Sequence, residues 1–294
     1  MVTSWCVNAN KKLSMLPSVI ICALAVVGLS SPVFAGPARV MRKHMPVEVL
    51  RDASGDPLRT IDSKLVSSNW SGYVLPKFLT KHHYMIAQAT WTVPTVTFHN
   101  IEAASSSWIG IGGFCTSKKC NQVDESLIQL GTEQDALSDT ASDYYAWYEM
   151  LPDFAIPTSL GVSPGDVITA SLSCAGDCLS TQVWTLSMTN ETTSQSWTQD
   201  FDYPSANLSL EVIEEAPTGG GGVLPLANFG KATFSNTTSS SMSVNFSKGD
   251  SIVLEDRQPH QRVESSNVSA PAPTKDGFNA CFNNSKTLAK CTKP

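Results

Sequence analysis

Residues 208–217 have the sequence LSLEVIEEAP, in which three glutamates, Glu211, Glu214 and Glu215, fall within five residues. Only 16% of the chain is charged, so this density of carboxylates is unusual. Side chains alternate between the two faces of a β-strand. A strand here would therefore place Glu211 and Glu215 on one face, and Glu214 on the apolar face at a strand end that reaches solvent. Neighbouring like charges raise each other's pKa, which is costly in a structural strand but useful in an acid–base site.

The same alternation recurs in short runs along the chain, which predicts an all-β fold. Gly, Pro, Ser and Asn separate the runs, and we find no long segment with helical periodicity. Many short strands with frequent turn residues are typical of a β-sandwich or a barrel. The segment after about Ser265 is rich in Ser, Pro and Asn, and we expect it to be a loop. The predicted strands are Ala87–Val93, Ser107–Ile111, Ser126–Leu130, Tyr144–Leu151, Asp166–Leu172, Gln182–Met188, Leu208–Glu214, Ala232–Phe234, Met242–Phe246 and Ser251–Leu254.

Two of these predicted strands carry polar side chains on a single face. One strand places Gln129 and Glu133 together, and the other places Trp147 and Glu149 together. A polar face is the ordinary solvated side of an antiparallel sheet. A large aromatic side chain such as Trp147 on that face instead indicates a groove. The alternation leaves both interpretations open.

The first 35 residues have the features of a secretory signal peptide. Positive charge at Lys11 and Lys12 precedes an apolar run over residues 16–29, and the small residue Ala35 suits a cleavage site. The apolar run is short for a membrane span, which needs about 20 residues. A retained membrane anchor is the alternative interpretation.

Residues 36–66 differ in character from the chain that follows them. They are basic on balance, contain turn signals and show little strand alternation, which indicates a pro-segment or flexible leader; an ordered N-terminal arm is the alternative. Residues 67–294 would then form a single domain with 12 Lys and Arg against 22 Asp and Glu, a net charge of −10. A basic leader can pair with carboxylates at neutral pH and lose that pairing as they protonate at low pH. The acidic balance argues against a nucleic acid or an anionic membrane as partner.

Six cysteines remain once the signal peptide is set aside. An even number in an exported chain indicates disulfides. Zinc ligation is the alternative, but no histidine lies near any of them. The spacing favours local pairs, the last of which would close the C-terminal tail. These pairs are Cys115–Cys120, Cys174–Cys178 and Cys281–Cys291.

Six motifs follow one another between Asn69 and Gly230: NWSGY from residue 69, ATWTVP from 89, WIGIGG from 108, LIQLG from 127, AWYE from 146 and EVIEEAP from 211. In this order and spacing the chain resembles the glutamic peptidases, or eqolisins, which are secreted acid endopeptidases. The resemblance implies a lectin-like, concanavalin-type β-sandwich of two seven-stranded antiparallel sheets.

The resemblance also implies the site residues. Gln129 and Glu215 match the catalytic pair of the family. Glu214 replaces a residue that is usually apolar and could be mistaken for the catalytic glutamate, but Glu215 shares a face with Glu211 and Glu214 does not. Gly112 stands where some members carry an aspartate that supports the site. Supporting or substrate-binding positions match Trp147, Glu149, Glu133 and Glu211.

A water held between the two catalytic side chains is the mechanism that the resemblance implies. Glu215 would take a proton from the water and later protonate the leaving amine. The Gln129 amide cannot ionise and carries donors suited to a developing oxyanion. The expected protein is an extracellular monomer that needs no metal or other cofactor. It acts on proteins or peptides, and it contacts no membrane once the signal is removed.

Two other functions are compatible with a polar face on a β-sandwich. A glycoside hydrolase uses two carboxyl groups, for which Glu149 and Glu215 would serve, but that reaction leaves Gln129 without a role. A lectin-like module without catalysis is the second alternative, because one fold hosts many functions.

Overall fold

The computed structural model describes residues 42–240, 242–255, 264–284 and 291–294, and these residues are almost all strand or loop. The predicted signal peptide, residues 1–35, lies outside the described residues. Within the described ranges the helical elements are α1 (Lys77–Thr80) and the 3₁₀ turn η1 (Phe246–Lys248). None of the helices described is long and apolar enough to cross a membrane.

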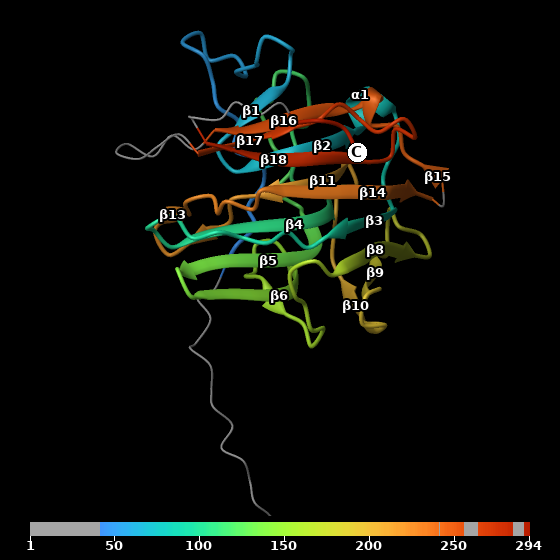
Figure 1. The fold of residues 1–294 in the computed structure, drawn as a ribbon. Coiled ribbons are helices and arrows are strands. Elements are labelled where there is room, and N and C mark those ends of the chain that lie inside the picture. Colours follow the sequence, from blue (N-terminus) through green and yellow to red (C-terminus); the bar gives the residue numbers. More distant parts are fainter. Residues whose placement is uncertain (1–41, 241, 256–263, 285–290) are drawn as a thin grey trace, which may run out of the picture. The chain divides into compact units, whose positions relative to one another are not determined.

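One large sheet runs through the protein as a single path of paired strands (Figure 1). The path is β10 (Gln195–Asp202), β9 (Val183–Asn190), β8 (Val167–Ala175), β3 (Ile86–Thr92), β14 (Lys231–Ser239), β18 (Phe278–Asn284), β17 (Glu264–Val268), β16 (Asp250–Glu255), β2 (Trp70–Pro76), β11 (Ser209–Glu215), β4 (Ala103–Ile111), β5 (Ile128–Ser138), β6 (Ala141–Met150) and β7 (Ile156–Pro157). The remaining strands are β1 (Leu65–Ser67), parallel to β16, β15 (Met242–Ser243), beside β14, and the hairpin of β12 (Thr218–Gly219) and β13 (Gly222–Val223).

The path folds back on itself, because β3 and β8 contact strands β4 and β5 that lie farther along it (Figure 1). This produces two antiparallel layers, which β18, β17 and β16 join. Strand β3 contacts β4, and β8 contacts both β4 and β5. This arrangement confirms the predicted all-β sandwich.

The apolar core lies between the two layers. It is built from alternate residues of both, such as Trp91 of β3, Leu172 of β8, Ile109 of β4 and Leu130 of β5. Strands β8 and β9 alternate between buried and partly exposed residues, as expected when one face meets water. Strands β2 and β11 are buried at every position, so something also covers the outer face of their layer.

Strand β11 shows the predicted alternation, with one correction. Leu210 and Val212 point into the core between the layers, whereas Ile213 packs in a second cluster on the outer face. Glu214 does not reach solvent as expected: its side chain is fully buried and accepts a hydrogen bond from the Ser107 hydroxyl of β4. The neighbouring strand supplies the partner, which the sequence of β11 alone could not reveal.

The segment after Ser265 also differs from expectation. It contains β17 and β18, which pair with each other and with both layers, rather than a loop. Ser and Asn in these strands lie among inward-facing apolar residues such as Val268, Phe278 and Ala280, which bury the sheet face. The six cysteines form the three local disulfides that their spacing favours.

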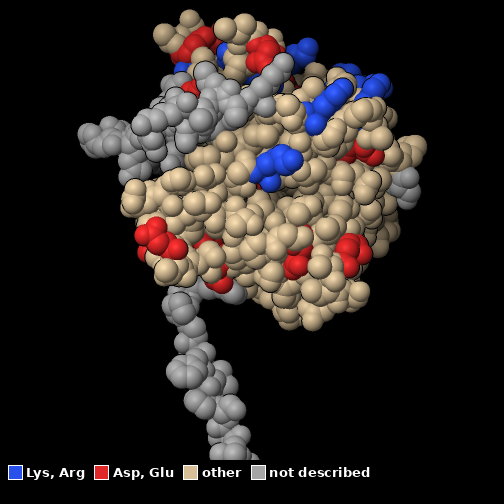
Figure 2. Space-filling model, in the orientation of Figure 1, with Lys and Arg blue, Asp and Glu red and all other residues tan. Residues whose placement is uncertain are grey.

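Charged side chains are sparse and scattered on the face drawn in Figure 2. The carboxyl groups of the predicted site are not part of a wet surface, since Gln129, Glu133, Glu215 and Trp147 are all fully buried. The solvated-face interpretation of these strands is therefore wrong.

Glu214 makes the pH dependence of stability testable. Burial raises the pKa of Glu214 to about 8, opposed by the hydrogen bond from Ser107, whereas an unfolded glutamate titrates near pH 4.3. A carboxyl with a raised folded pKa contributes stability that is complete below the unfolded pKa and is lost as pH rises toward 8. We expect Glu214→Gln to remove up to about 1 kcal/mol per pH unit from the fall in unfolding free energy between pH 4.5 and 8.

Urea unfolding of both proteins at several pH values measures this slope. Glu191→Gln, at an exposed position, serves as the matched control and should leave the slope unchanged. An unaltered slope in Glu214→Gln would show that this carboxyl is ionised in the folded protein.

Candidate active site

Cross-strand register arranges the predicted site residues in three rows on the outer face of the β11–β4–β5–β6 sheet. Each row takes one residue from each strand, and successive rows are two residues apart. The rows are Glu211, Gly110, Gln129 and Glu149; then Ile213, Trp108, Gly131 and Trp147; then Glu215, Ser106, Glu133 and Tyr145. Register thus brings every predicted site residue to one face.

Gly131 leaves the space in which Trp108 lies. A Cβ atom at Gly131 would come within 2.5 Å of both the Trp108 Cβ and the Ser107 carbonyl oxygen. Trp108 in turn donates a hydrogen bond from Nε1 to Glu215 Oε2 at 2.8 Å. The position of the Glu215 carboxyl on β11 therefore depends on Gly131 of β5, whose missing side chain makes room for Trp108 of β4.

Glu215 is fully buried in this arrangement. Burial raises its pKa well above the ordinary value, and the charge of Glu149 raises it further, while the Trp108 hydrogen bond and the backbone amide of Met45 lower it. Glu215 Oε1 completes no hydrogen bond within the described residues. This oxygen remains available as an acceptor.

Gln129 is held by its amide nitrogen. Nε2 donates to Glu149 Oε2 at 3.0 Å and to the backbone carbonyl oxygen of His44 at 2.7 Å. The Oε1 atom is buried and has no hydrogen-bond partner among the described residues. Gln129 therefore presents a donor to a peptide carbonyl and keeps an unused acceptor beside it.

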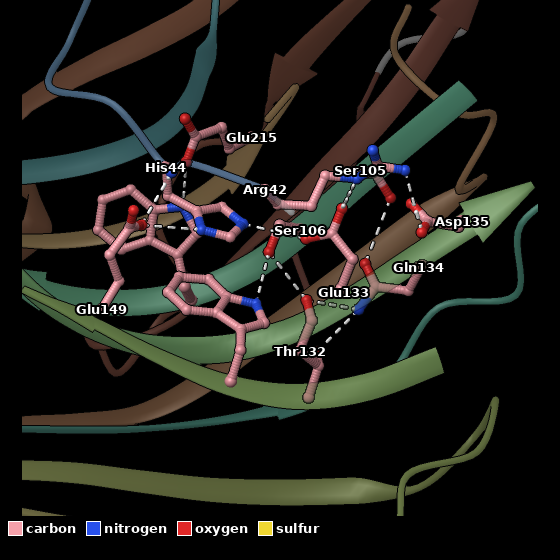
Figure 3. Close-up of polar contacts among 12 residues, drawn as sticks. Arg42, His44, Ser105, Ser106, Thr132, Glu133, Gln134, Asp135, Glu149 and Glu215 are labelled. Atoms are coloured by element: carbon pink, nitrogen blue, oxygen red, sulfur yellow. Dashed lines mark hydrogen bonds and ion pairs between the residues drawn. The ribbon is translucent and has the colours of Figure 1, made fainter. Parts of the chain in front are cut away.

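His44 lies in the centre of the site and was not predicted. Its ring stacks on Trp147 with centroids 3.6 Å apart and planes within 1°. Nδ1 lies 3.0 Å from Glu149 Oε2, and Nε2 lies 3.0 Å from Glu133 Oε2 (Figure 3). The backbone N–H of His44 also donates to Glu149 Oε2, at 2.8 Å.

The carboxyl groups of Glu149 and Glu133 face the two ring nitrogens of His44, so the protonation of the three side chains is coupled. Burial lowers the pKa of His44, which favours the neutral ring with a single N–H donor, while Glu149 opposes this shift. Burial raises the pKa of Glu133 to about 8, which favours the protonated carboxyl at neutral pH. A neutral ring that donates to one carboxyl can accept from the other if that carboxyl is protonated.

Arg42 lies next to the same acidic group. Its guanidinium is 3.2 Å from Asp135 Oδ2 and 3.8 Å from Glu133 Oε1. Burial, followed by the charge of Glu133, raises the pKa of Asp135 to about 7. Arg42 and His44, both from the basic stretch before residue 67, thus lie against carboxyl groups of the site.

The residues 42–50, which we call the covering segment, explain why the outer face is buried. Sequence reasoning identified their basic character but assigned no role to His44. Asn69 and Trp70 belong to the NWSGY motif, to which sequence analysis assigned no role. Both residues donate hydrogen bonds to the covering segment. No periodicity could reveal these contacts, since they join residues far apart in the chain.

Glu211 is the predicted site residue that stands apart from the cluster. It is buried in the same row as Gln129, with Gly110 between them, and burial raises its pKa well above the ordinary value. The charge of Asp124 raises the pKa further. Glu211 makes no hydrogen bond to Gln129 within the described residues.

Gly112 cannot carry the aspartate that some glutamic peptidases have. Its φ of +93° is in the left-handed region, and a Cβ atom would lie 1.7 Å from the Ser126 carbonyl oxygen. The Asp124 Oδ2 atom lies 3.4 Å from that same Cβ position. A carboxyl group therefore stands beside Gly112, supplied from a different part of the chain.

Comparison with known proteins agrees with this geometry. A model described as the Peptidase A4 family matches residues 68–273, which is most of the chain. The chain belongs to the Peptidase A4 family. Aspergillopepsin-2 from Aspergillus niger is 25% identical over 232 residues, which are 71% of this chain and 77% of that protein.

Solved structures show the same fold. Scytalido-glutamic peptidase, crystallised with a peptide-based transition state analog, superposes with a TM-score of 0.54 at 22% identity, covering 74% of this chain and 98% of that one. SCP-B, an eqolisin in complex with the tripeptide Ala-Ile-His, superposes with a TM-score of 0.52 at 22% identity and the same coverage.

Membership of the Peptidase A4 family confirms the resemblance seen in the motifs. The protein is a glutamic peptidase, a hydrolase of peptide bonds, rather than a glycoside hydrolase or a carbohydrate-binding module. Within the described residues, no group of three or more His, Cys, Asp or Glu side chains is arranged to hold a metal ion.

The contact between Gly131 and Trp108 gives a prediction for this Peptidase A4 protein. Gly131→Ala should displace Trp108 and destabilise the fold by about 1–3 kcal/mol, the usual cost of overpacking. It should also lower peptidase activity, because the Trp108 hydrogen bond to Glu215 is disturbed. Thermal unfolding and hydrolysis of a denatured protein measure the two effects.

Gly161→Ala is the matched control, because the nearest atom to its Cβ would be a side-chain oxygen at 3.5 Å, an ordinary contact. Equal stability and activity in the two variants would show that the tight approach at Gly131 is relieved without cost.

Proposed function

We propose that this glutamic peptidase is a secreted acid endopeptidase whose catalytic pair is Gln129 and Glu215. One observation carries the proposal: Gln129 Nε2 donates a 2.7 Å hydrogen bond to a backbone carbonyl, that of His44. A substrate carbonyl in the same place would receive this hydrogen bond as its oxygen becomes negative. A well-placed donor of this kind contributes about 2.7–4 kcal/mol to transition-state stabilisation.

Glu215 supplies the proton transfers in this mechanism. The backbone amide of Met45, the nitrogen that follows the carbonyl held by Gln129, is close enough to the Glu215 carboxyl to lower its pKa. As a carboxylate it removes a proton from the attacking water, and as an acid it returns that proton to the leaving nitrogen. Trp108 positions the carboxyl through its indole N–H.

An acid optimum follows from the carboxyl groups around Glu215. Burial is the largest cause of its raised pKa, and the charge of Glu149 is the next. Removal of the covering segment admits water, which lowers the pKa of Glu215 and allows it to ionise in acid. Burial also raises the pKa of Glu133 and of Glu149, and once protonated in acid these two groups no longer repel the Glu215 carboxylate.

The proposed chain organisation is a signal peptide over residues 1–35, a pro-segment over residues 36–66 and a monomeric peptidase domain over residues 67–294. The family match begins at residue 68, after the covering segment. The covering segment lies on the proposed catalytic pair, where a peptide substrate would have to bind. Three disulfides are consistent with secretion.

Substitution of the pair tests the function. Gln129→Ala and Glu215→Gln should each reduce proteolysis at least about 10²-fold, since each removes a transition-state interaction. The measurement is release of acid-soluble peptides from denatured casein between pH 2 and 7, with folding checked by circular dichroism.

Glu214→Gln is the matched control, because Glu214 adjoins Glu215 but faces the opposite side of β11. It should keep proteolytic activity. Activity that survives Glu215→Gln but disappears in Glu214→Gln would overturn the assignment of the catalytic glutamate.

A further inference from the structure

The covering segment crosses the site with a bend at Pro46, and backbone hydrogen bonds hold it on either side of that bend. Lys43 N donates to Thr218 O at 3.0 Å, and Thr218 N donates to Lys43 O at 2.8 Å. Farther along, Val47 N donates to Gly113 O at 2.9 Å. Extended peptides are commonly bound through such backbone pairing. The segment therefore occupies the site in the manner of a peptide substrate.

One peptide bond of the segment meets both proposed catalytic residues. The His44 carbonyl accepts a 2.7 Å hydrogen bond from Gln129 Nε2. The Met45 amide, on the other side of that bond, is close enough to the Glu215 carboxyl to lower its pKa. The next carbonyl, that of Met45, instead accepts from Trp70 Nε1 at 3.0 Å. The His44–Met45 peptide bond therefore differs from the next one, Met45–Pro46, in that its carbonyl is bound by Gln129.

The His44 side chain explains why the segment sits in this register. The ring is fully buried against Trp147, and each ring nitrogen lies 3.0 Å from a carboxyl oxygen, of Glu149 or Glu133. A shift of one residue would turn this side chain to the other face of the extended segment. It would also leave two buried carboxyl groups without their histidine partner.

We propose that the peptidase makes a first cut within its own pro-segment at the His44–Met45 bond, selected by the fit of His44 into the pocket of Trp147, Glu133 and Glu149. This inference rests on the proposed function of Gln129 and Glu215. The recognised substrate feature is a planar, nitrogen-bearing side chain on the acyl side of the cleaved bond.

The reaction consumes one water molecule. The water oxygen bonds to the His44 carbonyl carbon while Glu215 takes one water proton. The C–N bond to Met45 then breaks, and Glu215 returns the proton to the Met45 nitrogen. His44 becomes a C-terminal carboxyl group and Met45 a new amino terminus. Gln129 Oε1 and Glu215 Oε1 are both buried acceptors without a hydrogen-bond partner among the described residues, so each can accept a hydrogen bond from a water.

The test uses the full chain, transferred from neutral pH to values between pH 2 and 7. Intact mass and N-terminal sequencing should reveal a product that begins at Met45, with the sequence Met-Pro-Val. His44→Ala should slow formation of this product at least about tenfold, while the control His82→Ala, at an exposed position, should process as the wild type does. Glu215→Gln should leave the bond intact.

Casein hydrolysis by the same wild-type sample separates the two proposals. Casein cleavage with an intact His44–Met45 bond, or with processing elsewhere only, overturns the processing site and leaves the proposed function standing. Absence of casein cleavage at every pH overturns the proposed function itself. Unchanged processing in His44→Ala, with the fold preserved by circular dichroism, overturns the role of the histidine pocket.

Discussion

Burial of a carboxyl group without a partner costs several kcal/mol, and one face of the β11–β4–β5–β6 sheet buries four glutamates. At the centre of this face, the covering segment offsets the cost by supplying polar partners to the carboxyl groups. It supplies the His44 ring to Glu133 and Glu149, the His44 backbone N–H to Glu149, and the guanidinium of Arg42 to the edge. The rest of the site follows from this constraint, because the carboxyls keep their partners only while the segment stays in one register.

In the layer that contains β11, β4, β5 and β6, alternate residues have different roles. Those that face inward form the apolar core, and those that face outward form the site. In β4, Ile109 and Ile111 pack into the core, and between them Gly110 faces outward beside Gln129. In β11, Val212 packs inward while Glu215 points to the site. Substitutions in the inner set therefore change stability first. Substitutions in the outer set act on the carboxyl groups.

The elements predicted from sequence are those with strong local patterns. Alternation placed Glu211 and Glu215 on one face, short spacing indicated the disulfides, and the motif around Gln129 indicated that it belongs to the same face. Strand β10 was not predicted because every residue of it is at least partly exposed, so no apolar alternation marks it. Strand β18 was not predicted because Asn residues interrupt its apolar ones, and its pairing partners are distant in the chain.

His44 could not be predicted for a different reason. Its partners are 85 to 105 residues away, on β5 and β6, and no local pattern links a lone histidine in a basic stretch to carboxyls at that distance. The burial of Glu214 is similar, since its partner Ser107 belongs to a neighbouring strand. Local sequence indicates which face a residue occupies, whereas the tertiary fold decides what covers that face.

The backbone pairing of Lys43 with Thr218 has a consequence for the proteins that this peptidase can digest. Thr218 begins the β12–β13 hairpin and offers its N–H and C=O to any chain that lies fully extended beside it. A helix has already used those groups internally, and a strand inside a sheet has them paired with its neighbours. Under the proposed function, unfolded proteins are therefore the substrates that can pair with Thr218 in this way. A compact protein resists cleavage even where its sequence fits the site.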